Sequence, residues 1–304
     1  MPNISRRQFL GASAAFALAH PFQAQEAPDP ILDLHQHTPY NNRPRDLVLA
    51  HQDQHHVKTT VILPGEGWML KIIGGNRDSA AFEAAHSDRY VRFTSADPAE
   101  SLAVDVLRGN LQRGAIGIGE MKYRVAVDSP EMHRVYKLAE EMQVPVLIHF
   151  EYETYNTGFE RFHKVLKAYP KVNFIGHAQT WWGNISAGLD QLDLYPKGPV
   201  KPGGLTDRLL GDHANMYADL SAGSGLNAIT RDEEFYRGFI ARHSAKLLWG
   251  SDCDCHDGKG GGIRSGFCLA EQSLVLLRKL APDAATYRRI IYGNASKLLK
   301  LKQT

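Results

Sequence analysis

Short apolar runs recur along the chain, and most are followed by a stretch in which apolar residues have helical spacing. The predicted strands are residues 31–34, 59–63, 90–94, 115–119, 144–148, 172–176, 216–220 and 246–250. Their starts lie roughly 30 residues apart, except for a longer gap before residue 216, and a parallel βα unit needs about that length. Eight such units predict an α/β fold, a (β/α)8 TIM barrel in a single domain of about 250 residues.

The stretches between the predicted strands have helix signals. Residues 130–143 place Met132, Val135 and Leu138 on one face, with Asp128 or Ser129 as the cap before Pro130. Residues 265–280 repeat the pattern. The tail at 294–299 predicts a last helix that closes the bottom or the flank of the barrel.

The first predicted strand ends in a pair of histidines. On an extended strand Asp33, His35 and His37 are expected to share one face, because side chains alternate with a period of two. Neutral imidazole is a strong ligand for zinc and similar divalent ions. Two ligands do not complete a site, so other segments must contribute the rest.

Further metal-binding side chains follow other strands. Glu120 follows the fourth strand, His149 the fifth, His177 the sixth and Asp252 the eighth. Active sites of this barrel lie at the carboxyl ends of the strands. We therefore expect these residues to meet the first histidine pair in a metal site.

With these residues the chain resembles the metal-dependent amidohydrolase superfamily. The resemblance rests on His-x-His at 35–37, His149, His177 and the Gly-Ser-Asp at 250–252. Residues 292–299 are similar to the last helix of its amidohydrolase-related (amidohydrolase 2) branch. The resemblance extends from residue 31 to about 301 and implies a divalent cofactor, with zinc preferred and Mn, Fe or Ni as alternatives.

The resemblance also implies roles. His35 and His37 hold a first ion, and Asp252 binds the same ion and takes a proton from water. With one ion, His149 completes the ligand set and His177 orients or deprotonates the nucleophile.

With two ions, the resemblance implies that His149 and His177 hold the second and that Glu120 bridges both. Residues 117–123 are similar to the strand-four motif of the deoxyribonuclease-like hydrolases, whose glutamate binds metal. A bridging carboxylated Lys122 is a weaker alternative. Both stoichiometries stay open.

Three functions remain for such a site. The first is hydrolysis of an amide, ester, lactone or phosphoester of a small molecule, with Asp252 and His177 as catalytic residues. The second is nonoxidative decarboxylation of a hydroxylated aromatic or related acid. The third is a metal-binding barrel without catalysis.

Some side chains are candidates for substrate binding. The long segment 180–215 predicts a lid or wall over the site, with Trp181 or Trp182 as a substrate platform; the alternative is that both pack in the core or at a subunit contact. Lys122, His256 and Arg264 are the other substrate-binding candidates.

The first 27 residues resemble a twin-arginine export signal followed by a tether, which leaves 28–304 as the barrel. Arg6 and Arg7 precede an apolar run that is too short to span a bilayer, which needs about 20 apolar residues. We expect export through the Tat translocase to the periplasm or medium. Because the net charge is +2 and the sequence has no long basic run, nucleic acid is not expected as a partner, and a homo-oligomer stays open.

The three cysteines, Cys253, Cys255 and Cys268, do not form a spaced framework of pairs, so free thiols are expected. His51 and His55 have a ligand-like spacing on the first predicted helix. Because that helix should face outward, they are interpreted as surface residues.

Overall fold

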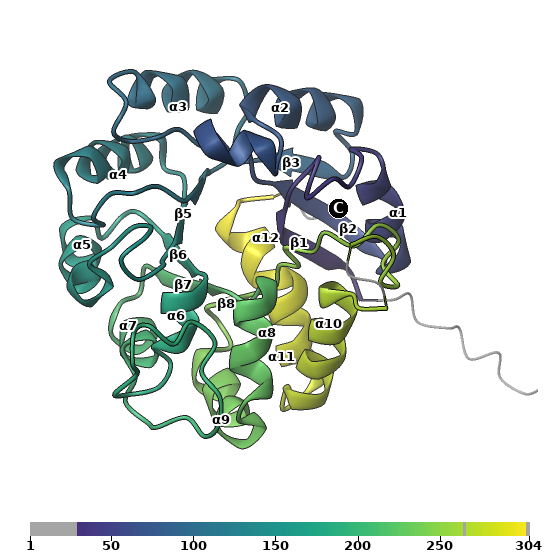
Figure 1. Ribbon diagram of the computed structural model, residues 1–304, viewed down its shortest axis with the longest axis vertical. Helices are drawn as coiled ribbons and strands as arrows, with labels where there is room; N and C mark the ends of the chain where they lie inside the picture. Colours follow the sequence, from purple (N-terminus) through teal and green to yellow (C-terminus); the bar gives the residue numbers. More distant parts are fainter. Residues whose placement is uncertain (1–28, 264–265, 302–304) are drawn as a thin grey trace, which may run out of the picture.

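The computed structural model describes residues 29–263 and 266–301. All eight predicted strands are present, at the centre of the ring seen in Figure 1. They are β1 (Ile31–Gln36), β2 (Val57–Ile62), β3 (Tyr90–Arg92), β4 (Ile118–Met121), β5 (Val146–His149), β6 (Phe174–His177), β7 (Met216–Asp219) and β8 (Leu247–Leu248).

Most of the helices form the outer layer of the ring, whereas the C-terminal helix lies over the strands (Figure 1). The helices are α1 (Leu47–Gln54), α2 (Asn76–Ala85), α3 (Ala103–Gln112), α4 (Pro130–Met142), α5 (Phe162–Ala168), α6 (Gln179–Gly183), α7 (Leu205–Asp212), α8 (Ala222–Thr230), α9 (Glu233–His243), α10 (Leu269–Leu280), α11 (Ala284–Arg288) and α12 (Asn294–Leu298). A short 3-10 helix, η1 (Gly67–Lys71), follows β2.

The strands are parallel and close into a barrel. Two runs of neighbours, β1-β2-β3 and β4-β5-β6-β7-β8, account for the ladders. A parallel bridge between Thr94 and Ile118 joins the runs on one side. On the other side Leu34 N–H donates to the carbonyl oxygen of Trp249 at 3.2 Å. The predicted TIM barrel is therefore confirmed.

One apolar cluster fills the barrel interior and is closed by the C-terminal helix. The strands and the residues directly after them contribute Leu32, Leu34, Val61, Leu63, Phe93, Leu147, Ile175 and Leu248, and the C-terminal segment contributes Ala295, Leu298 and Leu299. The barrel interior at this end is therefore apolar, and the predicted site residues lie at the opposite, carboxyl ends of the strands. The prediction that the tail closes the barrel is confirmed.

The α4 helix shows how local sequence sets the elements. Ser129 caps it, because its hydroxyl accepts from the Met132 N–H at 3.3 Å, and Pro130 occupies the first turn. Met132, Val135 and Leu138 are buried beneath it. This helix connects β4 and β5, the strands that carry Glu120 and His149.

The predicted export signal at 1–27 lies outside the described residues. None of the helices in the described part of the chain has both the length and the apolar character needed to cross a bilayer.

Candidate metal centre

Six metal-binding side chains meet at the carboxyl ends of the strands, with Glu120 between two pairs of histidines. His35 Nε2 and His37 Nε2 lie 3.2 Å apart, and Glu120 Oε2 lies 3.8 Å and 3.7 Å from them. The other Glu120 oxygen, Oε1, lies 2.5 Å from His149 Nδ1 and 3.7 Å from His177 Nε2. Glu120 therefore turns one oxygen toward each histidine pair.

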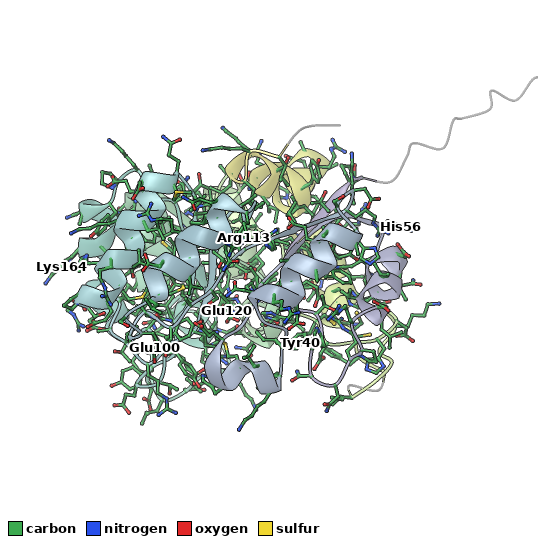
Figure 2. The ribbon with its side chains drawn as sticks, turned by 90° about the horizontal axis from the view of Figure 1, so that it is seen from above. Tyr40, His56, Glu100, Arg113, Glu120 and Lys164 are labelled. Atoms are coloured by element: carbon green, nitrogen blue, oxygen red, sulfur yellow. The ribbon has the colours of Figure 1, made fainter. Side chains whose placement is uncertain are left out.

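Asp252 lies beside the pair formed by His35 and His37. Its Oδ1 lies 3.5 Å from His37 Nε2 and 3.8 Å from His35 Nε2. Tyr40 donates its hydroxyl to the same oxygen at 2.7 Å. In Figure 2, Glu120 and Tyr40 lie in the half of the molecule away from the C-terminal helix, which is drawn in yellow.

Each histidine has one ring nitrogen in the site and the other fixed outside it. His37 Nδ1 lies 2.7 Å from the carbonyl oxygen of Leu63, and His149 Nε2 lies 3.2 Å from Glu151. Such outer partners set the tautomer and the ring orientation of a metal ligand. The four histidines are therefore oriented as metal ligands are, and not as unrelated residues of the core.

Asp219, at the end of β7, orients two of the rings at once. Its Oδ2 lies 2.7 Å from His35 Nδ1 and 3.0 Å from His177 Nδ1, and it accepts from the Ser221 hydroxyl at 2.8 Å. Asp219 is fully buried. The sequence interpretation missed it, because the seventh strand was predicted to end one residue later, at Leu220. The available signal was a carboxylate at the same strand end as the other site residues.

The electrostatics of the site favour a cation. Burial lowers the pKa of His35, but the carboxylates of Asp252, Asp219 and Glu120 outweigh it and raise that pKa to about 10. Burial raises the pKa of Glu120, but the neighbouring His149 holds it well below its usual range. A group of buried carboxylates thus keeps a positive charge at His35, and a divalent cation satisfies the same demand.

The backbone around the site departs from the regular strand that the sequence predicted. A register irregularity lies between Asp33 and Gln36 of β1. Asp33 therefore does not share a face with the histidines, and instead accepts from Gln52 at 2.9 Å and from the Ser251 hydroxyl at 2.6 Å. Asp252 has a φ of 44°, an uncommon conformation for a residue with a side chain.

A cavity of about 260 Å³ opens above the ligands. Lys122 lines it, and its ammonium lies 5.8 Å and 5.6 Å from the ring centres of Trp68 and Tyr155, which stack on each other. Tyr195, from the long segment after β6, also lines it. The predicted wall over the site therefore exists, but Tyr195 contributes to it whereas Trp181 and Trp182 do not.

The prediction that Trp181 or Trp182 forms a substrate platform is wrong, and the alternative that both pack in the core is confirmed. They are 0% and 2% exposed, and Trp182 donates its indole N–H to the carbonyl oxygen of Asp219 at 2.8 Å. They pack in the core beside the strand ends and so cannot serve as a substrate platform. Short helix α6, which turns both rings inward, could not be read from the sequence.

The other two substrate-binding candidates are also absent from the described wall. His256 does not line the cavity; its ring faces Gly262 in the loop after β8. Arg264 lies outside the described residues.

A larger cavity, of about 680 Å³, lies at the other end of the barrel, where Pro30, Tyr217 and Tyr292 line it. None of the described groups that could hold a metal ion includes a residue of its wall. The chemistry, and not the cavity size, places the candidate site at the carboxyl ends of the strands.

The donor set fits divalent metal ions. Three overlapping groups each bring their ligand atoms within 4.8 Å of one another, and they are His35-His177-Asp252, His35-His37-Glu120 and Glu120-His149-His177. Two imidazole nitrogens on one tetrahedral zinc are separated by about 3.3 Å, given Zn–N bonds of about 2.0–2.1 Å. The 3.2 Å between His35 and His37 agrees with that value.

Comparisons with known proteins agree on the fold. No family model matches the chain, and no curated protein matches it. The solved structures include a probable 2-pyrone-4,6-dicarboxylic acid hydrolase from Acinetobacter baumannii, at 12% identity and a TM-score of 0.60, covering 89% of this chain and 99% of that one.

Two further structures are similar. An uncharacterised TIM-barrel protein from Bordetella bronchiseptica has 14% identity and a TM-score of 0.59, covering 89% of this chain and 98% of that one. A 2,6-dihydroxybenzoate decarboxylase from Rhizobium has 15% identity and a TM-score of 0.54, covering 90% and 99%. Because the identities are so low, these similarities show only the fold, which is a single-domain (β/α)8 barrel.

Proposed function

We propose that this chain is a metal-dependent enzyme of the amidohydrolase superfamily that hydrolyses a bond in a small carboxylic acid. The observation that carries the proposal is the position of Glu120, with one oxygen toward His35 and His37 and the other toward His149 and His177. A carboxylate in that position suits a pair of ions, and paired ions are typical of hydrolytic sites.

Ions held by His35, His37, His149 and His177 would lower the pKa of water to about 7 and would polarise a carbonyl oxygen of the substrate. Asp252 then accepts the proton of the attacking water and delivers it to the leaving group. Tyr40 donates to Asp252 Oδ1, which holds the carboxylate in place and leaves Oδ2 for the proton. Asp219 keeps His35 and His177 in their ligand tautomers.

The wall of the cavity supports an acid as substrate. Lys122 places a positive charge beside the aromatic rings of Trp68 and Tyr155. A carboxylate of the substrate can pair with the ammonium while a flat part of the substrate lies along Trp68, which lines the cavity. The named hydrolase and decarboxylase among the similar structures both act on acids, which is consistent with this choice.

Decarboxylation is the second candidate. The same cavity combines a cation, aromatic walls and metal ligands, and one similar structure is a dihydroxybenzoate decarboxylase. In that reaction the bond between the carboxylate carbon and its neighbour would break to release carbon dioxide, and the electron pair left on that neighbouring carbon would take a proton from the carboxyl group of Asp252. The two reactions differ in their products, so one experiment separates them.

The experiment supplies the metal-loaded full chain with two panels of small molecules, lactones of di- and tricarboxylic acids and hydroxylated benzoic acids. Hydrolysis opens a lactone by adding water, and decarboxylation releases carbon dioxide. We expect ring opening that stops when a chelator removes the metal. Release of carbon dioxide without ring opening would establish the second candidate instead, and metal-loaded protein inert on both panels would contradict the proposal.

Lys122→Met tests the acid-binding role. A charge-assisted hydrogen bond contributes about 1.5–3 kcal/mol, so kcat/KM for an anionic substrate should fall roughly 10- to 100-fold. Lys122→Arg is the control, because it keeps the charge and should retain most of the activity. Equal kcat/KM in wild type and Lys122→Met would show that Lys122 does not bind the substrate.

A further inference from the structure

A second group of potential ligands lies outside the catalytic opening. Cys253 and Cys255 belong to the loop after β8, Cys268 precedes α10, and His51 belongs to α1. Their ligand atoms all lie within 4.8 Å of one another. All four residues are at most 1% exposed, and none of the cysteines forms a disulfide. This corrects the interpretation of His51 as a surface residue.

The distances match a shared cation. Cys253 Sγ and Cys268 Sγ lie 3.8 Å apart, and Cys268 Sγ lies 3.6 Å from His51 Nε2. Tetrahedral zinc with Zn–S of about 2.3 Å and Zn–N of about 2.0–2.1 Å separates two sulfurs by about 3.8 Å and a sulfur from a nitrogen by about 3.5 Å. A disulfide requires a separation of about 2.0 Å. The sulfurs are thus spaced as two ligands of one ion and not as a bonded pair.

A hydrogen-bond donor and a positive charge lie beside these cysteines. The Gly260 N–H donates to Cys255 Sγ at 3.1 Å. The guanidinium of the buried Arg43 donates to the carbonyl oxygens of Cys253 and Cys255 at 2.9 Å and 3.1 Å. Three thiolates around a divalent ion leave one net negative charge, and Arg43 offsets it.

We propose that Cys253, Cys255, Cys268 and His51 bind a structural zinc ion. Four protein ligands close the coordination shell and leave no position for water or substrate, which distinguishes a structural site from a catalytic one. Because the ligands come from three segments, the ion fastens α1 and α10 to the loop after β8. Asp252 lies in that loop directly before Cys253, so the ion also holds the catalytic carboxylate in place.

Cobalt substitution is the direct test, because a cobalt ion bound by thiolates absorbs through sulfur-to-metal charge transfer. The donors of the catalytic opening are nitrogen and oxygen, so it gives no such band. We expect the full chain, prepared under reducing conditions and stripped of metal, to develop the band as Co²⁺ is added. The double variant His35→Ala/His37→Ala should keep it.

Matched substitutions assign the fourth ligand. His51→Ala should lose about one zinc ion per chain, whereas His51→Cys should keep it, because thiolate replaces imidazole in such sites. The exposed His56, just beyond α1, supplies the control, and His56→Ala should retain the full zinc content. The wild-type cobalt spectrum tests the proposal even if a variant does not fold.

Two results would overturn the proposal. The first is cobalt binding to the reduced wild-type protein without a thiolate band. The second is a Cys253–Cys268 disulfide in the purified full chain, found by mass spectrometry together with zinc content unchanged by His51→Ala.

Discussion

Replacing Asp219 with asparagine tests how the metal site is built. Oδ2 of Asp219 accepts from Ser221 Oγ at 2.8 Å and lies 2.7 Å from His35 Nδ1 and 3.0 Å from His177 Nδ1. Asparagine has nearly the same shape, but its amide offers either a donor or an uncharged acceptor at that point. The imidazoles then lose the partner that keeps Nε2 free for metal.

The expected loss of metal affinity follows from the number of histidine ligands that Asp219 holds. Loss of an outer partner of one histidine ligand typically weakens metal binding about 10- to 100-fold, or about 1.4–2.7 kcal/mol. Because Asp219 serves two ligands, we expect the upper end, about 100-fold. The backbone should be unaffected, since the substitution neither adds nor removes volume.

Competition with a coloured chelator measures the affinity of wild type and variant. Asp207→Asn is a matched control, because Asp207 also lies against a histidine, with 2.5 Å between its Oδ1 and His243 Nε2, on the outer helices α7 and α9. That variant should bind metal as wild type does. Unchanged metal affinity in Asp219→Asn would refute the idea that His35 and His177 bind metal through Nε2 while Asp219 holds their Nδ1 atoms.

Three other outcomes are expected. Asp252→Asn should keep the circular dichroism spectrum of the wild type but reduce kcat by about 10²–10⁴-fold, and a normal rate would exclude Asp252 as the proton carrier. Gly250→Ala should lower the free energy of unfolding by about 1–3 kcal/mol in chemical denaturation, because the added Cβ would lie 2.8 Å from His35 Cβ and 2.9 Å from Asp219 Oδ1; equal stability would show that the strand ends tolerate more volume. Metal affinity should rise with pH by up to about tenfold per unit below pH 10, because the metal displaces the proton that the raised pKa keeps on His35. In the metal-free protein that proton stabilises the fold below pH 6.5, and the stabilisation is lost as the pH rises toward 10. A metal affinity that does not depend on pH would contradict this interpretation of His35.

The barrel could be predicted from the sequence because each βα unit repeats the same apolar pattern. The strand ends could be predicted too, and side chains that follow parallel strands must meet at one end of a barrel. This reasoning brought Glu120, His149, His177 and Asp252 to the histidine pair, where the structure places them. Their roles as ligands stay a proposal, as do the export signal and the localisation.

The errors arose where tertiary contacts decide the outcome. Trp181 and Trp182 lie in a segment that reads as a loop, and only the fold shows that they fill the core. His51 was assigned to the surface because outer helices of a barrel face solvent, yet the loop after β8 covers it with three cysteines. Asp219 was missed through an error of one residue in the end of a strand.

Anomalous X-ray scattering from crystals of the zinc-loaded full chain tests the central claim most directly. We predict two peaks about 3.5–4 Å apart on either side of the Glu120 carboxylate, one in contact with His35 and His37 and the other with His149 and His177. Zinc-loaded crystals without a peak within about 2.0–2.2 Å of those imidazole nitrogens would contradict it.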